Sequence, residues 1–249
     1  MIYTSGQIGK RFHVPLRVIY DWRIKINRSF HAFGSRSGGA FPIPGDSYHR
    51  YGFPEWLVNY FPQIPLPPKQ GIGVIGHQQL VNLQLRNADI TTLKVCAIVN
   101  AANPTLLGGS GVKGAIHRAA GPKLSAACRK LHGCRTGQAK ITIGFNLPAK
   151  YVIHTVGPIW DNSDDNHQSQ ELRDCYWHSL ELTDQYHLTS IAFPAISTGA
   201  YHYPKHLAAQ VAAAAVYEWV YTQPNTGIQT IIFVVHDDKN EKEYRWRLG

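Results

Sequence analysis

The 249-residue sequence lacks several features that would place it outside the ordinary globular proteins. No run of 18 or more apolar residues occurs, so nothing in it predicts a membrane-spanning helix. The first residues, MIYTSGQIGKRF, contain no apolar segment of the kind that a secretory signal needs. With 44% hydrophobic and 16% charged residues, the composition is typical of a folded domain with a substantial core. We therefore expect a cytoplasmic protein without a membrane partner.

Cysteine is scarce, and its spacing carries no motif. The four cysteines are Cys96, Cys128, Cys134 and Cys175. No C-x-x-C pair occurs, and although His202 and His206 are four residues apart, no Glu or Cys beside them completes a metal motif. The sequence therefore predicts no metal and no cofactor. We interpret the cysteines as buried thiols in a reducing, intracellular compartment.

Acidic residues are also scarce. The formal net charge is +9, which favours an anionic partner without identifying it. No Asp or Glu occurs between Asp89 and Asp161, whereas nine Lys or Arg fall in that window. Residues 1–70 hold nine Lys or Arg against three acids, and residues 71–249 hold sixteen against thirteen. Together with the Pro-rich stretch Pro62–Pro68, this difference predicts a basic N-terminal extension over residues 1–70 and a main domain over residues 71–249.

Hydrophobic periodicity within the main domain predicts strands alternating with helices. The expected strands are Leu80–Arg86, Val95–Val99, Ile141–Phe145, Tyr151–His154, Ile191–Phe193 and Ile228–Val235. The expected helices cover Ser169–Tyr186, a segment from Pro204 in its first turn to about Tyr221, and Glu241–Arg247. This alternation favours an α/β fold in which a mixed or mostly parallel sheet is covered on both faces.

A glycine-rich loop lies between the second predicted strand and an Ala-rich helix. Gly109, Gly111 and Gly114 satisfy G-x-G-x-x-G, which lets the backbone and the N–H groups of a helix N-terminus approach a phosphate. A dinucleotide-binding Rossmann domain would need an acid about 20 residues further on, and none is present. No G-K-[ST] follows the loop, which excludes a P-loop. The loop therefore predicts a site for a phosphorylated ligand of another class.

The N-terminal segment Tyr3–Arg23 has the spacing of a helix-turn-helix. Ile8 and Phe12 would pack inward, and Pro15 would open a second helix. The pattern resembles the excisionase and MerR-type proteins, with a basic face formed by Arg11, Arg17, Arg23, Lys25 and Arg28. Two interpretations stay open: nucleic-acid binding through this face, or an extension that packs on the main domain.

Several long motifs in one order give a more specific signal. They are NADITTLKVCAIVNAANPTLLGG at residues 87–109, GAIHRAAGP at 114–122, TGQAKIT at 136–142, LPAKYVIHTVGPIW at 147–160 and FPAISTGAYHYP at 193–204. Over about residues 80–248 the chain resembles the MacroD-type macrodomains. That resemblance implies a three-layer α/β/α fold with a mixed central sheet. It also implies binding of ADP-ribose and hydrolysis of mono-ADP-ribose from acidic protein side chains, or deacetylation of O-acetyl-ADP-ribose.

The resemblance also implies roles for individual residues. Asp89 would accept a hydrogen bond from the adenine amino group, whereas Asn103 and Tyr201 would lie at the distal ribose. Two loops would hold the diphosphate, the first through backbone N–H groups. The ligand-binding set so implied is Asp89, Ile90, Asn103, Gly109, Ser110, Gly111, Val112, Ser197, Thr198, Gly199, Ala200 and Tyr201. We expect His117 and His154 to be structural, and Asn100 to hold the first loop together.

The chain departs from the family pattern at two positions. Lys113 stands where the family's hydrolases carry an Asp that helps to activate water, and Ser110 replaces a glycine. A charged lysine cannot act as a general base, although it can attract an anion or stabilise a leaving carboxylate. The candidate catalytic set is therefore Asn103, Lys113 and Tyr201. Two functions stay open: a hydrolase of reduced activity, or a reader that binds ADP-ribose without turning it over.

Overall fold

The computed structural model describes residues 2–3, 41–42, 51–54, 72–75, 80–161, 165–223 and 225–248. The chain divides into two compact units, Met1–Leu66 and Pro67–Gly249. In the first unit, β1 (Ile2–Tyr3), β3 (Tyr51–Pro54) and β2 (Phe41–Pro42) form an antiparallel sheet in that order. Apart from Tyr3, the predicted helix-turn-helix lies outside the described residues and stays a prediction, as does the domain boundary at residue 70.

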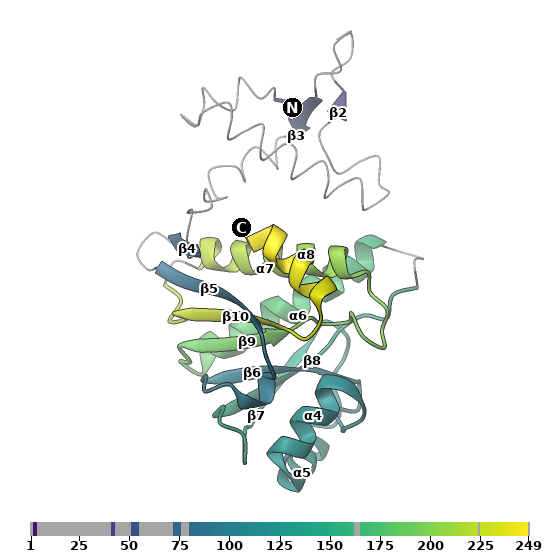
Figure 1. Ribbon diagram of the computed structural model, residues 1–249, viewed down its shortest axis with the longest axis vertical. Helices are drawn as coiled ribbons and strands as arrows, with labels where there is room; N and C mark the ends of the chain where they lie inside the picture. The colour runs from purple at the N-terminus through teal and green to yellow at the C-terminus, as the bar shows by residue number, and fades with distance from the viewer. Residues whose placement is uncertain are drawn as a thin grey trace. The chain divides into compact units, whose positions relative to one another are not determined.

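The second unit is built on a seven-stranded sheet with the order β4-β5-β10-β9-β6-β8-β7. Its strands are β4 (Ile72–Ile75), β5 (Leu80–Asn87), β6 (Ala97–Ala102), β7 (Ala139–Ile143), β8 (Tyr151–Val156), β9 (Ser190–Pro194) and β10 (Thr230–Val235). The five inner strands pair in parallel, whereas β4 and β7 pair antiparallel at the two edges. This mixed sheet confirms the predicted fold class (Figure 1).

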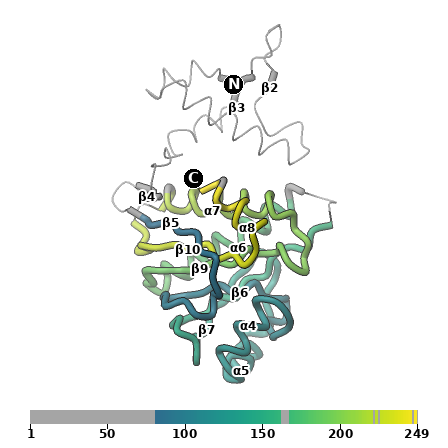
Figure 2. Tube along the Cα trace, viewed as in Figure 1, coloured from purple at the N-terminus to yellow at the C-terminus, as the bar shows by residue number. Residues whose placement is uncertain are grey.

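Helices cover both faces of the sheet. They are α4 (Gly111–Ala120), α5 (Pro122–Lys130), α6 (Asp165–Gln185), α7 (Lys205–Thr222) and α8 (Asp238–Leu248), with a short 3-10 helix η2 (Ile90–Thr92) after β5. Neighbouring residues of β9 show the two layers, because successive side chains of a strand point to opposite faces. Ala192 packs into the core beneath α4 and α5, whereas the Phe193 ring lies 5.0 Å from the Tyr176 ring of α6. Figures 1 and 2 show α4 and α5 grouped apart from α7 and α8.

The elements form where the hydrophobic pattern places them. The strand β10 and the inner part of β6 are buried along nearly their whole length, as expected for strands covered on both faces. Along α6, the predicted inward-facing residues Leu172, Tyr176, Leu180 and Thr183 are all fully buried. Pro204 differs from expectation: its ψ of 125° keeps it outside the helix, so it is the N-cap of α7 rather than part of the first turn.

The sheet contains a topological switch point between β6 and β9, which are parallel neighbours. After β6 the chain passes through α4 and α5 toward β7 and β8 on one side, whereas after β9 it passes through α7 to β10 on the other. Because the two connections leave in opposite directions, the carboxyl ends of β6 and β9 leave a crevice between them, where ligands bind in open α/β sheets. Among the described residues, no helix combines the length and apolarity needed to cross a membrane.

Candidate functional site

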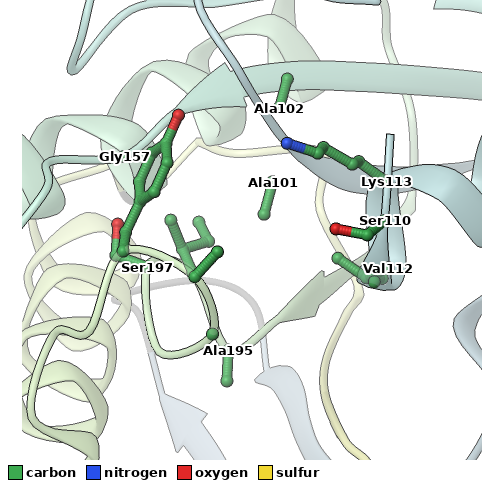
Figure 3. Close-up of a pocket in the computed structure, with 13 residues that line it drawn as sticks. Ala101, Ala102, Ser110, Val112, Lys113, Gly157, Ala195 and Ser197 are labelled. Atoms are coloured by element: carbon green, nitrogen blue, oxygen red, sulfur yellow. The ribbon is translucent and has the colours of Figure 1, made fainter. Parts of the chain in front are cut away.

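A pocket of about 170 Å³ lies at this switch point, beyond the carboxyl ends of β6, β8 and β9. Loops that follow these strands form its walls (Figure 3). The lining residues are Ala101, Ala102, Ser110, Gly111, Val112, Lys113, Gly157, Ala195, Ile196, Ser197, Gly199, Ala200 and Tyr201. The structure therefore brings the two predicted loops together, although they are nearly 90 residues apart in the sequence.

The first wall is the N-terminus of α4. Ser110 is the N-cap residue and its side chain makes no capping hydrogen bond, so the first backbone N–H groups of the helix have no cap from it. These N–H groups and the helix dipole make the end of α4 attractive to an anion. The close packing of the loop against α4 requires glycine at Gly114, because a Cβ there would overlap the carbonyl oxygen of Gly109.

Lys113 brings a positive charge into this wall. Its side chain lies over Gly109, where an added Cβ would come within 2.6 Å of Lys113 Cε and 3.3 Å of Nζ. Figure 3 shows the lysine extending across the pocket from the side of Ser110 toward Ala102. No carboxylate among the described residues forms an ion pair with it. The ammonium group of Lys113 and the positive end of the α4 dipole therefore both attract an anionic ligand.

The second wall is the loop that follows β9. Ser197 lies in this wall with a φ of 64°, a left-handed conformation that costs a non-glycine residue free energy and is concentrated at functional sites. Its carbonyl oxygen accepts a hydrogen bond from the Tyr203 N–H at 3.0 Å, which fixes the turn. Its buried hydroxyl has no hydrogen-bond partner among the described residues. The loop is also fixed at Tyr201, whose carbonyl oxygen accepts from the Trp160 N–H at 2.9 Å.

Gly157 joins the second wall to the end of β8. A Cβ at Gly157 would overlap the hydroxyl of Ser197 and lie 2.7 Å from Ile196 Cγ2, so the close approach of these segments requires glycine. The sequence motifs did not predict Gly157 as a lining residue, nor Ala101, Ala102, Ala195 and Ile196. The signal available in the sequence was the group of small residues at the ends of buried strands, where a wider side chain would fill the crevice.

Five predicted ligand-binding residues do not line this pocket. They are Asp89, Ile90, Asn103, Gly109 and Thr198. Asp89 is the N-cap of η2, and its Oδ1 accepts hydrogen bonds from the Thr91 N–H at 2.9 Å and the Thr91 hydroxyl at 2.8 Å. Both hydrogen bonds lower the pKa of Asp89, and the bond from the Thr91 backbone N–H has the larger effect. The carboxylate is exposed, so its predicted contact with adenine stays a prediction.

Asn103 and Ile90 occupy different environments. The Asn103 side-chain oxygen accepts a hydrogen bond from the Thr105 hydroxyl at 2.9 Å, and its carbonyl oxygen accepts one from the Leu106 N–H at 2.9 Å. Both bonds stabilise the turn after β6, close in the chain to Ala101 and Ala102. The Ile90 side chain is buried in the core beneath α4, which leaves only its backbone for a ligand.

The two histidines lie behind the first wall rather than in the pocket. His154 is fully buried, and burial, with the nearby His117 adding to it, lowers its pKa to about 3. The Asn100 amide lies 3.1 Å from His154 Nδ1, and the Thr142 hydroxyl lies 2.9 Å from Nε2. Because the amide nitrogen can only donate, Nδ1 is the acceptor and Nε2 carries the proton. His154 is therefore a neutral residue that links β6, β7 and β8.

The chemistry of the pocket suits an anionic ligand. Its polar side chains are two serines, a lysine and a tyrosine, and no carboxylate is among the lining residues. At about 170 Å³ it is smaller than sites that enclose a whole drug-sized ligand, so a ligand of that size would extend beyond it. Among the described residues, no group of three or more His, Cys, Asp or Glu side chains is placed to hold a metal ion. The fold and the site thus define a phosphate-binding α/β domain with a ligand crevice at the sheet's switch point.

Comparison with known proteins gives the family. A family model described as Macro domain matches residues 99–212. A macro domain-containing protein of Lactiplantibacillus plantarum is 52% identical over 170 residues, which cover 68% of this chain and 98% of that protein. The ADP-ribose glycohydrolase MACROD1 of Bos taurus is 52% identical over 166 residues, covering 67% of this chain but only 51% of that protein. The chain belongs to the macro domain family.

Solved structures share the fold. The Oceanobacillus iheyensis macrodomain with ADP superposes with a TM-score of 0.63 at 41% identity, covering 68% of this chain and 90% of that one. The Trypanosoma brucei macrodomain in complex with ADP-ribose gives a TM-score of 0.63 at 38% identity, covering 67% of this chain and 69% of that one. The similarity confirms the predicted macrodomain fold for the second unit.

Proposed function

We propose that the chain binds ADP-ribose in this pocket and hydrolyses the bond between ADP-ribose and an acidic protein side chain, or the acetyl ester of O-acetyl-ADP-ribose. The observation that carries the proposal is the meeting of two loops around a crevice that holds a helix N-terminus and a lysine but no carboxylate. Relatives support it: MACROD1 of Bos taurus is named an ADP-ribose glycohydrolase, and the Trypanosoma brucei macrodomain was solved with ADP-ribose.

In this proposal the diphosphate lies between the two walls. The N–H groups of Gly111 and Val112 and the ammonium of Lys113 neutralise its charge, and the loop at Ser197 closes on it from the other side. The adenosine extends toward Asp89, and the distal ribose lies toward Tyr201 and Asn103. The 170 Å³ pocket would hold the middle of the ligand, so its two ends would extend along the surface.

Hydrolysis without a carboxylate in the pocket needs another way to direct the water. We propose that a phosphate oxygen of the bound ligand orients the water at the distal ribose, where the ester bond breaks and the carboxylate leaves. Lys113 would stabilise the departing carboxylate, and tight positioning would supply much of the rate. The missing Asp makes the turnover slow. A non-catalytic ADP-ribose reader is the second candidate, and the lysine in the position of the Asp is the observation that favours it.

Calorimetry with ADP-ribose tests the binding part of the proposal. Gly199 lines the pocket, and an added Cβ there meets no atom within 4 Å, so Gly199→Glu is tolerated by the fold. Its carboxylate would face the diphosphate, and we expect at least a hundredfold loss of affinity from like-charge repulsion at close range, corresponding to about 3 kcal/mol.

Gly227→Glu is the matched control, because Gly227 is also exposed and a Cβ there also meets nothing within 4 Å, but it does not line the pocket. The control should bind ADP-ribose like the parent. A folded Gly199→Glu variant with the parent's affinity would show that the ligand does not lie in this pocket. Release of ADP-ribose from an ester-linked protein by the parent then separates hydrolase from reader.

We also propose nucleic-acid binding as a separate property of residues 1–70. The support is the excess of nine Lys or Arg over three acids and the helix-turn-helix spacing of Tyr3–Arg23. The alternative is that the segment packs on the macrodomain.

A further inference from the structure

The two helical layers of the macrodomain carry opposite charge. Helices α4 and α5 contain five Lys or Arg and no acid. Helices α6, α7 and α8 contain six Lys or Arg against nine acids. The formal charge of the first pair is therefore +5 and that of the second group is −3, although the second unit as a whole is only weakly basic. One side of the macrodomain consequently attracts anions much more strongly than the other.

Several cations of the α6–α8 layer form ion pairs with carboxylates, whereas those of α4 and α5 form none among the described residues. In the α6–α8 layer, Arg173 pairs with Glu218 at 2.7 Å and Arg245 with Glu241 at 2.6 Å, and Lys205 pairs with Asp237 at 2.7 Å. On α4, α5 and the loop that follows, five cations are exposed, and none forms an ion pair with a carboxylate of the described residues. We use the name basic face for these five exposed cations, which are Arg118, Lys123, Arg129, Lys130 and Arg135.

The basic face begins on the helix whose first turn lines the pocket. Lys113 lines the pocket from the first turn of α4, and Arg118 is five residues further along the same helix, or about 7–8 Å along its axis. The Arg118 side chain lies back along α4 toward its N-terminus, because its Nη1 lies 3.1 Å from the position that a Cβ would take at Gly114. An extended peptide covers about 3.3–3.6 Å per residue, so two or three residues match the rise along α4. Lys113 and Arg118 also lie roughly 140° apart around the helix, so a bound segment must in addition pass around α4 to reach both.

We propose that this basic face recognises acidic residues that flank the ADP-ribosylated side chain of a protein substrate. The inference rests on the proposed function, in which the modified residue is an esterified Asp or Glu whose carboxylate departs near Lys113. The substrate class is then a segment rich in Asp and Glu, which complements five unpaired cations. A binding surface for single-stranded nucleic acid would instead carry aromatic side chains on which bases stack, and neither α4 nor α5 contains a Phe, Tyr or Trp.

The test uses the full-length protein and two ADP-ribosylated peptides with a non-hydrolysable linkage. One peptide carries Glu at two positions on each side of the modified residue, and the other carries Gln at the same positions. We expect the parent to bind the Glu peptide about two- to tenfold more tightly than the Gln peptide at low salt, with the difference shrinking as salt rises. Free ADP-ribose is measured beside them by calorimetry.

Paired variants locate the effect. Arg118→Gln/Lys123→Gln removes two charges near the pocket, and Arg129→Gln/Lys130→Gln removes two further along α5. Lys239→Gln/Lys242→Gln on α8 is the matched control, because both lysines are exposed and neither has an ion pair among the described residues. The first variant should lose most of the preference for the Glu peptide, the control should keep it, and both should bind free ADP-ribose like the parent.

Equal affinity of the parent for the two peptides overturns the proposal, as does a loss in the α8 control as large as in the α4–α5 variants. Binding of a DNA oligonucleotide that disappears with the α4–α5 charges, without any preference for the Glu peptide, also overturns it and identifies nucleic acid as the partner. Absence of free ADP-ribose binding, with a charge-dependent preference for the Glu peptide retained, would overturn the proposed function alone.

Discussion

At the scale of single residues, the proposed binding and the proposed turnover both depend on Lys113. It occupies the first turn of α4, lies over Gly109 and is the only charged side chain among the residues that line the described pocket. An ammonium at this place favours an anion in the ground state. It offers no lone pair to a water molecule while it is charged, so binding and turnover are expected to respond oppositely to its replacement.

The change Lys113→Asp tests this separation. We expect release of ADP-ribose from an ester-linked protein to rise by about a hundred- to ten-thousandfold, because general-base assistance is typically worth factors of that order. Affinity for ADP-ribose should fall, because a cation next to the diphosphate becomes an anion. Single-turnover kinetics and calorimetry measure the two effects.

Lys113→Gln is the control that removes the charge without adding a base. It should weaken binding and leave turnover low. If the parent already turns over as fast as Lys113→Asp, no acid is needed at this position. If none of the three proteins releases ADP-ribose while all bind it, the reader function stands.

At the scale of elements, the first loop depends on the packing behind it. β6 and β8 pair in parallel with Asn100 opposite His154, and their side chains are hydrogen-bonded inside the core. On the other side of the ring, Thr142 comes from β7. A single neutral histidine therefore joins three strands, one of which leads directly into the first wall of the pocket. Protonation would place an unpaired charge in the core.

This arrangement predicts that the free energy of unfolding decreases as the pH falls. An unfolded histidine titrates near pH 6.5, whereas the pKa of His154 in the folded chain is about 3, so the unfolded chain binds more protons between these values. Stability is therefore complete above about pH 6.5 and falls as the pH decreases, by up to about 1.4 kcal/mol per pH unit. His117, whose pKa burial also lowers, adds to the slope.

Urea unfolding between pH 7 and pH 5.5 measures this slope, because ordinary carboxylates stay almost fully ionised in this range. His154→Gln should be less stable than the parent at pH 7 but lose less stability on acidification. His206→Gln, at an exposed position of α7, should keep the parent's slope. A slope unchanged by His154→Gln would show that this histidine does not control the acid response.

At the scale of the whole molecule, the chain combines two compact units of different charge density. Residues 1–70 carry an excess of six positive charges in 70 residues, whereas residues 71–249 carry an excess of three in 179. Long-range attraction of an anionic polymer would therefore fall mostly on the N-terminal residues and on the basic face of the macrodomain. The two contributions are separable, because they lie on different parts of the sequence.

Deletion of residues 1–70 tests the N-terminal contribution. If these residues bind nucleic acid, the full chain should shift duplex DNA in a gel with an affinity that falls steeply with salt, because Lys and Arg contacts release counterions. The truncated protein should lose the shift and keep its affinity for ADP-ribose. Absence of any shift at low salt contradicts the nucleic-acid proposal, and a truncated protein that is insoluble or melts much lower supports packing on the macrodomain.

Local patterns in the sequence determined the elements of the macrodomain and the character of its loops. Apolar runs at Val95–Val99, Ile191–Phe193 and Ile228–Val235 overlap β6, β9 and β10, because a strand buried on both faces needs a continuous apolar run. The glycines of the first loop and the absence of acids up to Asp161 predicted an anion site. Boundaries moved by a few residues, since ends of elements depend on caps and partners rather than on periodicity.

Only the tertiary structure decided which segments meet. The pairing of β6 with β9 brings Ala101 and Ser197 into one pocket across almost 100 residues, and the fit of Gly157 against Ser197 closes it. Hydrophobic periodicity fixes the face of an element but not its neighbour, so strand order and small lining residues stay hidden in a sequence. The same holds for charge: the sequence shows how many cations there are, but the fold pairs Arg173 of α6 and Lys205 of α7 with carboxylates that are distant in the chain. It leaves the five cations of the basic face exposed and without an ion pair among the described residues.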